Sequence, residues 1–228
     1  MKFANNLNSS SPVRHMHTHS APPTVHESGR WPGVELYYPP IKFIPKQDTY
    51  ETQQEAEARF WRWGATTRAN TLLFDLEDGC QRKKESRELL RAVLPKLERD
   101  DLMVAVRINQ FHTEQYRDDL AMLRDLKDHI HVVVMAKAGE EYGAAEIRDL
   151  CSELVGMNAA IAVEPIIEHP KSLKIVDQLL AYDPVCHVVF GIHDFSKAMG
   201  VRITARRWTE ELRIFRDMLL FEARIAGK

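Results

Sequence analysis

Six short apolar runs, separated by charged segments, recur along the chain, and this alternation constrains the fold more than any other feature. Continuous apolar, β-branched runs are typical of strands buried on both faces of a parallel sheet. The charged segments have apolar residues at helical spacing, which predicts amphipathic helices that cover the sheet. The sequence therefore predicts an α/β fold. The expected strands are 34–44, 71–74, 102–106, 131–136, 159–163 and 187–190, and the expected helices are 84–97, 116–126, 143–154, 172–180 and 208–225.

A polar residue closes each of the last five predicted strands: Asp75, Arg107, Lys137, Glu164 and Asp194. Successive members are 32, 30, 27 and 30 residues apart, close to one βα unit, which indicates an internal repeat. In a TIM (β/α)8 barrel, functional groups come from the carboxyl ends of many strands, whereas a doubly wound sheet concentrates them at one switch point. No GxGxxG or P-loop follows the first predicted strand. The pattern favours a TIM barrel.

The predicted barrel is incomplete within this sequence. At roughly 30 residues per unit, eight βα units need about 240 residues, and the range 34–228 holds 195. About six units are present, so we expect strands seven and eight to be missing and the barrel domain, 31–228, to be truncated at its C-terminal end. Such a chain is either a fragment of a longer protein or is completed by a partner. Residues 1–30, polar and rich in histidine, are predicted to be a disordered tail.

Composition narrows the functional class. Lysine and arginine number 31 against 33 acidic residues, a formal charge of −2, so nothing predicts a nucleic-acid surface or an anionic membrane partner. The apolar runs are too short to span a bilayer, and no apolar signal-peptide core follows the first residues. Cys80, Cys151 and Cys186 are widely spaced, which predicts reduced thiols and a cytoplasmic protein.

The end of the second predicted strand concentrates negative charge. Asp75, Glu77 and Asp78 are three carboxylates within four residues, and they repel one another unless a cation, an arginine or water compensates. Arg107 closes the next strand, and its rigid fork suits a carboxylate or a phosphate. Two alternatives stay open: a solvated acidic loop that caps the next helix, and purely structural pairing of Arg107 with Asp75 or Glu77.

Glu164 and Asp194 are the predicted metal ligands. Both follow apolar runs, and burying two carboxylates is costly without a cation. Ligand sets made only of oxygen favour a hard ion, with Mg²⁺ as the first choice and Mn²⁺ as the second. His193 precedes Asp194 on what we expect to be a strand, so its side chain should point to the opposite face. We expect it to pack there or to contact a metal-binding residue without binding the metal itself.

Three other residues receive lesser roles. Lys137 could form a Schiff base, but beside so many carboxylates it is more plausible as an ion-pair or substrate-carboxylate partner. Glu168 and His169 are expected to begin the helix after the fifth strand, and we rank them below Glu164 as ligands.

Together these residues resemble the citrate lyase β-subunit-like branch of the HpcH/HpaI aldolase family. The resemblance covers 34–228, in order. It rests on Tyr-Tyr-Pro-Pro at 37–40, Leu-Phe-Asp-Leu-Glu-Asp at 73–78, Val-Arg-Ile-Asn at 106–109, Ala-Lys at 136–137, Val-Glu at 163–164 and Phe-Gly-Ile-His-Asp at 190–194. It departs from the family pattern at Gly-Cys 79–80, Met-Ala 135–136 and Pro165, which bears on the substrate.

The resemblance implies a TIM barrel of the pyruvate/phosphoenolpyruvate superfamily, a Mg²⁺ ion, and carbon–carbon bond chemistry through an enolate. It implies that Glu164 and Asp194 bind the metal, that Arg107 binds substrate, and that Glu77 and Asp78 lie near the metal-bound waters. It also implies a homo-oligomer, a trimer or a hexamer.

The sequence therefore predicts a Mg²⁺-dependent carbon–carbon lyase. The expected substrates are a hydroxyacyl-CoA of the citryl or malyl type, or a 2-keto-hydroxy acid. Two alternatives stay open: phosphoenolpyruvate-type phosphoryl or hydrolytic chemistry at the same site, and a non-catalytic barrel subunit. With an incomplete barrel, we expect the activity of this chain alone to be in question.

Overall fold

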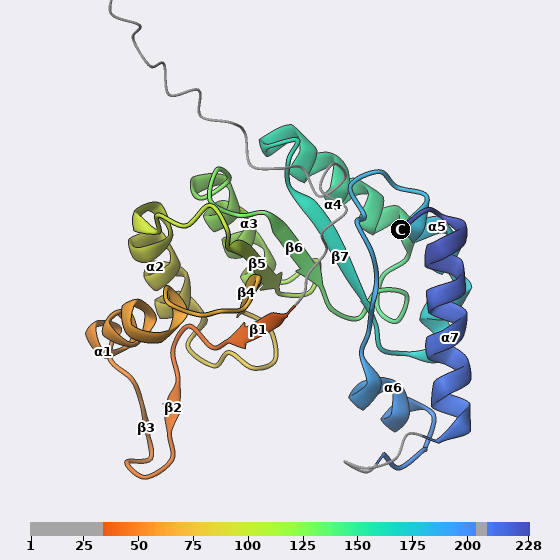
Figure 1. The fold of residues 1–228 in the computed structure, drawn as a ribbon, viewed down its shortest axis with the longest axis horizontal. Coiled ribbons are helices and arrows are strands. Elements are labelled where there is room, and N and C mark those ends of the chain that lie inside the picture. The colour runs from red at the N-terminus through yellow and green to blue at the C-terminus, as the bar shows by residue number, and fades with distance from the viewer. Residues whose placement is uncertain (1–33, 204–208) are drawn as a thin grey trace, which may run out of the picture.

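A single sheet of six parallel strands organises the protein (Figure 1). The computed structural model describes residues 34–203 and 209–228. The strand order is β1-β4-β5-β6-β7-β8, so each strand pairs with the next one of the sheet along the chain. Their bounds are Glu35–Tyr38, Thr71–Asp75, Met103–Ile108, Val132–Met135, Ala162–Ile167 and Val189–Phe190. Among the described residues β1 and β8 do not pair with each other, so the strands form a half-barrel. The expected α/β fold, a TIM barrel with about six units, is confirmed.

The two faces of the sheet pack against different apolar clusters. Side chains alternate between faces along each strand, so Leu72, Phe74 and their counterparts face a large core under the helices. Leu73, Ala105, Val134 and their counterparts form a second, smaller apolar cluster on the inner face. Because both faces are apolar, the middle strands read as the continuous hydrophobic runs seen in the sequence.

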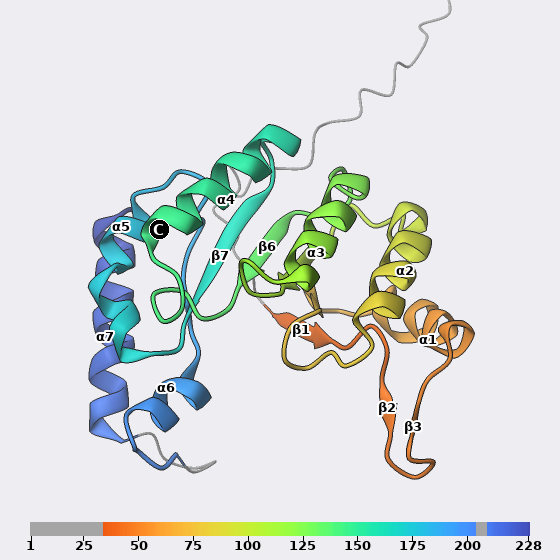
Figure 2. The same ribbon diagram turned by 180° about the vertical axis from the view of Figure 1, so that it is seen from behind.

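The helices pack along the outer face, as Figure 2 shows for α2, α3 and α4. Helix α3 begins after Thr113, whose hydroxyl accepts from the backbone N–H of Tyr116 at 3.1 Å, so the local sequence sets the start of the helix. The helices are α1 (Gln53–Arg59), α2 (Lys83–Val93), α3 (Glu114–Asp125), α4 (Ala144–Met157), α5 (Val176–Leu180), α6 (Ile192–Ala198) and α7 (Glu210–Ile225). None of the described helices combines the length and the apolar character needed to cross a bilayer.

Two expected strands are shorter in the structure than predicted. The run 34–44 is not one strand: β1 stops at Tyr38, and β2 (Phe43–Ile44) turns back to pair with β3 (Thr49–Tyr50). Pro39 and Pro40 explain the break, because proline has no N–H to donate to a ladder. The run 187–190 is a strand only at Val189–Phe190, and 191 begins the turn into α6.

Three expected helices also differ. The expected helix 172–180 divides into a 3-10 turn, Pro170–Lys174, and the short helix α5. The expected helix 84–97 becomes α2, followed by a 3-10 turn, Leu94–Lys96, where Pro95 prevents α-helical hydrogen bonding. The expected helix 208–225 is α7, and its first residue, Trp208, lies outside the described residues. The predicted tail, 1–30, also lies outside them and stays a prediction.

Candidate functional site

Asp75 and Arg107 form the centre of a polar cluster at the carboxyl ends of the strands. Asp75 ends β4 and is paired in register with Arg107 of β5. The Arg107 guanidinium donates from Nε to Asp75 Oδ1 at 2.8 Å and from its terminal nitrogen to Oδ2 at 2.6 Å. Burial lowers the pKa of Arg107, but the hydrogen bonds and charge of Asp75 outweigh it and raise the pKa above its usual value. The arginine is therefore a permanent, partly buried cation.

The loop after β4 folds around the Asp75 carboxylate. Its two oxygens accept the backbone N–H groups of Glu77 at 2.9 Å and Gly79 at 3.1 Å. A Cβ atom at Gly79 would lie 2.2 Å from Asp75 Oδ2, so only glycine fits this approach. The ammonium of Lys83 holds the same loop by donating to the carbonyls of Leu76 and Glu77.

Glu77 is the second buried carboxylate of the cluster. Its Oε2 accepts the backbone N–H of Asp78 at 2.8 Å and lies 3.6 Å from the Arg107 guanidinium, while its buried Oε1 has no hydrogen-bond donor. Burial raises the pKa of Glu77, against the lowering effect of the Asp78 N–H and of Arg107. Asp78 itself is exposed.

Lys137 brings a second positive charge into the cluster. It follows β6 in a left-handed conformation, with φ at 58°, which non-glycine residues adopt rarely. Its ammonium lies 3.5 Å from Glu77 Oε1 and 3.9 Å from Asp78 Oδ2. Burial lowers the pKa of Lys137, but Glu77 and Asp78 raise it above its usual value. A lysine held protonated in this way is an ion-pair partner and a poor Schiff-base nucleophile.

Glu168, which the sequence ranked low, belongs to the cluster. It lies directly beyond β7, is 6% exposed, and accepts the backbone N–H of Lys137 at 2.5 Å. Burial raises the pKa of Glu168 to about 7; the Lys137 N–H lowers it, and the charges of Asp194 and Glu77 raise it. His169, not Glu168, caps the 3-10 turn that follows, Pro170–Lys174.

A signal for Glu168 was present in the sequence. The apolar residues Ile166 and Ile167 continue the run past Pro165, so the strand extends four residues beyond its predicted end at 163. Alternation then places Glu164, Ile166 and Glu168 on one face.

Asp194 occupies the first turn of α6 and not a strand end. It is exposed, and so is His193, so the expectation that His193 packs inside is wrong. Residues this close in a helix lie on its surface at 100° intervals and do not alternate between two faces of a sheet. Gly191 brings the α6 entry against Glu168, because a Cβ there would lie 2.6 Å from Glu168 Cβ.

Glu164 lies deeper in the half-barrel, in the middle of β7. It is 1% exposed, and its Oε2 lies 2.8 Å from Nε2 of His187. Burial of Glu35 raises the pKa of that residue to about 7, and the nearby Glu164 carboxylate adds a smaller upward effect. The structure thus brings together five residues at the strand ends, hereafter the strand-end cluster: Asp75, Glu77, Arg107, Lys137 and Glu168. Glu164 lies outside this cluster, beside His187 and Glu35.

A buried network behind the strand-end cluster escaped the sequence prediction. Asn109 donates to Leu76 O and to Asp119 Oδ2, tying the end of β5 to the loop after β4. Arg87 of α2 in turn donates to Asp119 Oδ1 at 2.7 Å. These residues lie far apart in the sequence and share no motif, so only the fold reveals that they meet.

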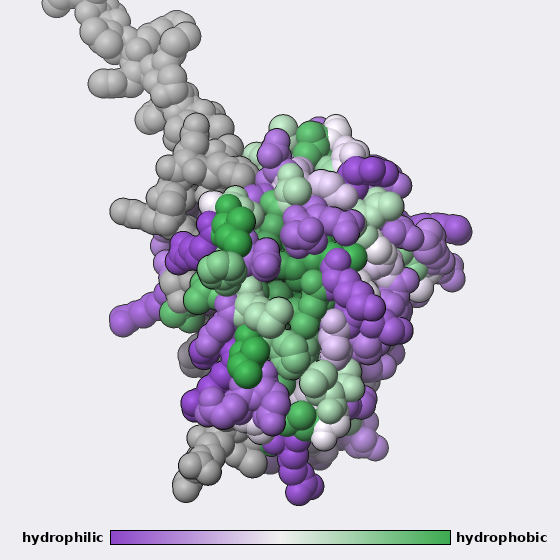
Figure 3. All heavy atoms as spheres, turned by 90° about the vertical axis from the view of Figure 1, so that its right-hand side faces the viewer, coloured by the Kyte–Doolittle hydropathy of each residue, from purple (hydrophilic) through white to green (hydrophobic). Residues whose placement is uncertain are grey.

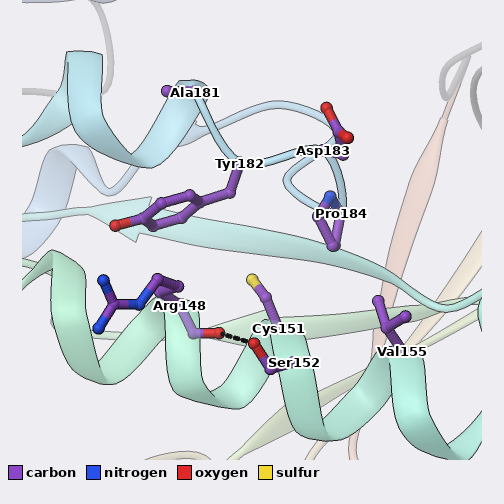
Figure 4. Close-up of a pocket in the computed structure, with 8 residues that line it drawn as sticks. All are labelled: Arg148, Cys151, Ser152, Val155, Ala181, Tyr182, Asp183 and Pro184. Carbon is purple, nitrogen blue, oxygen red and sulfur yellow. Dashed lines mark hydrogen bonds between the residues drawn. The ribbon is translucent and has the colours of Figure 1, made fainter.

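A cavity of about 370 Å³ lies elsewhere, between α4 and the segment after α5 (Figure 4). Arg148, Cys151 and Ser152 line one side, and Tyr182 faces them. It shares no residue with the strand-end cluster. Within the described residues no three His, Cys, Asp or Glu side chains form a ready metal site. Asp194 interacts electrostatically with Glu168, and carboxylate oxygens are the donors that Mg²⁺ prefers.

A comparison with models of protein families identifies the family of this chain. The model of the HpcH/HpaI aldolase/citrate lyase family matches residues 54–227. The chain belongs to this family. The predicted resemblance is therefore confirmed, while the search of curated proteins finds no match.

Solved structures related to this HpcH/HpaI family chain share its fold. The citrate lyase β subunit of Mycobacterium tuberculosis, complexed with oxaloacetate and magnesium, is 22% identical, with a TM-score of 0.60 over 85% of this chain and 74% of the other. RipC of Yersinia pestis is 21% identical, with a TM-score of 0.58 over 85% and 71%. CitE of M. tuberculosis with magnesium, acetoacetate and coenzyme A is 21% identical, with a TM-score of 0.59 over 85% and 62%. At these identities the similarity establishes the fold.

Proposed function

We propose that this HpcH/HpaI family chain carries the site of a Mg²⁺-dependent carbon–carbon lyase that works through an enolate. The observation that carries the proposal is the strand-end cluster, where Asp75, Glu77 and Glu168 are buried around two cations, Arg107 and Lys137. Related structures were solved with magnesium and small carboxylates, which supports the same chemistry here.

We assign the metal to Glu168 and Asp194, and not to Glu164 as the sequence predicted. Asp194 acts electrostatically on Glu168, whereas Glu164 contacts His187 inside the half-barrel. Bound there, Mg²⁺ would supply the positive charge that stabilises an enolate oxygen. With a pKa of about 7, the Glu168 carboxyl is about half protonated at neutral pH, and a cation that bound there would displace the proton into the solvent.

Arg107 and Lys137 are the groups that would orient the substrate. The Arg107 fork is fixed by Asp75, so its remaining nitrogen is held in place beside Glu77 without rotamer loss. Such a preorganised cation binds a substrate carboxylate or carbonyl oxygen. Glu77, protonated more readily than a free carboxyl, can hold a proton at Oε1 beside the Lys137 ammonium, with Asp78 at the rim.

The substrate class we propose is a hydroxyacyl-CoA of the citryl or malyl type, or a 2-keto-hydroxy acid. Coenzyme A and acetoacetate in the related CitE complex support the thioester. We extend the proposal to a cytoplasmic homo-oligomer, a trimer or a hexamer by family resemblance; the three cysteines are free thiols, in keeping with a reducing compartment.

Calorimetry with Mg²⁺ and assays with citryl-CoA, malyl-CoA and 2-keto-4-hydroxy acids test the proposal. We expect Mg²⁺ binding that Glu168→Gln weakens at least tenfold, while the exposed control Glu140→Gln leaves it unchanged. Retro-aldol cleavage should depend on Mg²⁺ and fall with Arg107→Leu. Phosphate release from phosphoenolpyruvate without cleavage would favour phosphoryl chemistry, and metal binding without turnover would favour a non-catalytic subunit. Absence of metal binding would refute the proposal.

A further inference from the structure

A fully buried carboxylate behind the strand-end cluster has no role in the proposed site. Asp119 of α3 accepts two hydrogen bonds at its Oδ2 from Asn109, from the backbone N–H and from Nδ2, both at 2.7 Å. Its Oδ1 accepts from Nε of the buried Arg87 at 2.7 Å. Burial raises the pKa of Asp119, and the hydrogen bonds from Asn109 and Arg87 oppose this effect. Because all three partners are N–H donors, the site matches a carboxylate.

The side chain of Asn109 connects this carboxylate to the loop after β4. Asn109 directly follows β5, and its Nδ2 carries two hydrogens. One hydrogen bonds to Asp119 Oδ2, and the other bonds to the carbonyl of Leu76 at 2.8 Å. Since both neighbours of Nδ2 are acceptors, the reversed orientation of the amide would place oxygen against oxygen. Asp119 therefore fixes the orientation of the group that holds Leu76.

Leu76 lies between two carboxylates of the strand-end cluster, Asp75 and Glu77. Its backbone N–H donates to the carbonyl of Arg107 at 2.9 Å, and its own carbonyl accepts from Asn109. The residue is thus held by backbone groups on both sides. Because the peptide bond is planar, the position of the Leu76 carbonyl also sets the position of the Glu77 N–H and Cα.

Helix α2 supports the same loop at two points. Lys83 donates to the carbonyls of Leu76 and Glu77 at 2.7 and 2.6 Å. Arg87 lies four residues further along α2, on the same helix face, and holds Asp119. The loop is therefore supported directly through Lys83 and indirectly through Asp119.

We propose that Asp119 is a positioning residue: by orienting the Asn109 amide it fixes the Leu76–Glu77 peptide and so holds the Glu77 carboxyl beside Lys137. The Lys137 ammonium lies 3.5 Å from Glu77 Oε1, so a small displacement of this peptide changes their contact. The proposal rests on the proposed function, in which Glu77 holds a proton next to Lys137. A purely structural network would hold α2 and α3 together and leave Glu77 unaffected.

Four variants separate these two roles. Asp119→Asn changes the size very little, but an amide has one acceptor oxygen and cannot satisfy both Arg87 and Asn109. Asn109→Ala removes only the amide and leaves the ion pair of Arg87 with Asp119 in place. Asp118→Asn is the near control, because Asp118 also pairs with Arg87, at 3.2 Å, but its side chain is 54% exposed. Asp217→Asn is the distant control, on α7, which lies on the side of the molecule shown in Figure 3.

The first test is amide hydrogen exchange by NMR, which needs no turnover. The N–H groups of Glu77 and Gly79 donate to Asp75. They should exchange at least about tenfold faster in Asp119→Asn and in Asn109→Ala, because a loop without this support opens more often. The increase should exceed any increase in β6, whose amides report global unfolding, and both controls should match wild type. A loop increase no larger than that of β6 in both variants overturns the proposal.

The second test measures Mg²⁺-dependent cleavage. Asp119→Asn and Asn109→Ala should lower kcat at least about tenfold and change KM by less than about threefold, because Arg107 keeps its bonds to Asp75. In a chain that already carries Glu77→Gln, Asp119→Asn should lower kcat by less than about twofold, because the positioned carboxyl is gone. Additive effects of the two substitutions overturn the proposal. A wild type without turnover refutes the proposed function alone, and hydrogen exchange then decides whether Asp119 fixes the loop.

Discussion

Glu164 and Glu168 share one face of the same chain segment, four residues apart, and yet they lie in unlike surroundings. Glu168, at the carboxyl end of β7, accepts a backbone N–H and borders Lys137 and Asp194. Glu164, inside the half-barrel, has His187 and Glu35 as its ionisable neighbours. The strand ends of a barrel meet loops that supply backbone donors and cations, whereas Glu164, inside the half-barrel, meets side chains from β1 and from the segment before β8. Depth along a barrel strand, and not residue type, therefore sets the surroundings of these two carboxylates.

We expect the largest effect from a substitution that removes the central cation of the strand-end cluster. Arg107→Leu leaves Asp75 and Glu77 buried without their partner, and we expect a loss of about 3–5 kcal/mol in the free energy of unfolding. Urea denaturation of wild type and variant measures it. Arg91→Leu is the control: Arg91 also pairs with an aspartate, Asp125, but both are exposed, so the loss should be about 0–1 kcal/mol. Equal losses would contradict the distinction between buried and exposed pairs.

Magnesium should separate the two glutamates of β7 directly. At about 100 times its dissociation constant, Mg²⁺ should stabilise the wild type by about 2.7 kcal/mol, because it binds only the folded state. Glu168→Gln, which weakens binding at least tenfold, should remove about half or more of the shift in thermal midpoint, while Glu164→Gln should retain it. The reverse result would return the metal to Glu164, as the sequence predicted.

Gly79→Ala tests how tightly the loop closes on Asp75. The added Cβ would lie 2.2 Å from Asp75 Oδ2, which forces a shift, and we expect a loss of about 1–3 kcal/mol. Gly156→Ala makes the same chemical change near the end of α4, where nothing lies within 4 Å of the new methyl group. That variant should gain up to about 1 kcal/mol. Chemical denaturation of both variants checks the contrast, and a neutral Gly79→Ala would show that the loop is loose.

The smallest effect concerns pH and the interior carboxyl Glu35. Its pKa is raised from 4.5 to about 7, so between these values the folded state binds more protons than the unfolded state. Stability from this group is present below pH 4.5 and is lost as pH rises through about 7. Glu35→Gln should remove about 1–2 kcal/mol of that decline, after allowance for solvent screening. Denaturation midpoints at pH 5 and pH 8 measure it, and an unchanged difference between them would show that Glu35 titrates normally.

Much of the fold could be predicted because its signals are local. Continuous apolar runs and helical spacing exposed the alternation of strands and helices, and the repeat near 30 residues pointed to a barrel of about six units. The same repeat placed Asp75 and Arg107 at neighbouring strand ends, where they pair in register. Pro39 and Pro40 are a local signal as well, because they end β1 at Tyr38 inside the run predicted as one strand.

What the sequence by itself determined is the order of the elements, because burial on both faces leaves its mark on each strand separately. Only the tertiary structure decided where β7 ends, since Ile166 and Ile167 stay in the sheet by pairing with Val189 and Phe190 of a strand more than twenty residues away. That pairing carries Glu168 to the strand-end cluster and leaves Glu164 inside. The tertiary structure likewise decided that Asp194 belongs to helix α6. Hydrogen-bond partners between distant strands set these positions, and the local pattern shows only that the apolar run continues past Pro165 through Ile166 and Ile167.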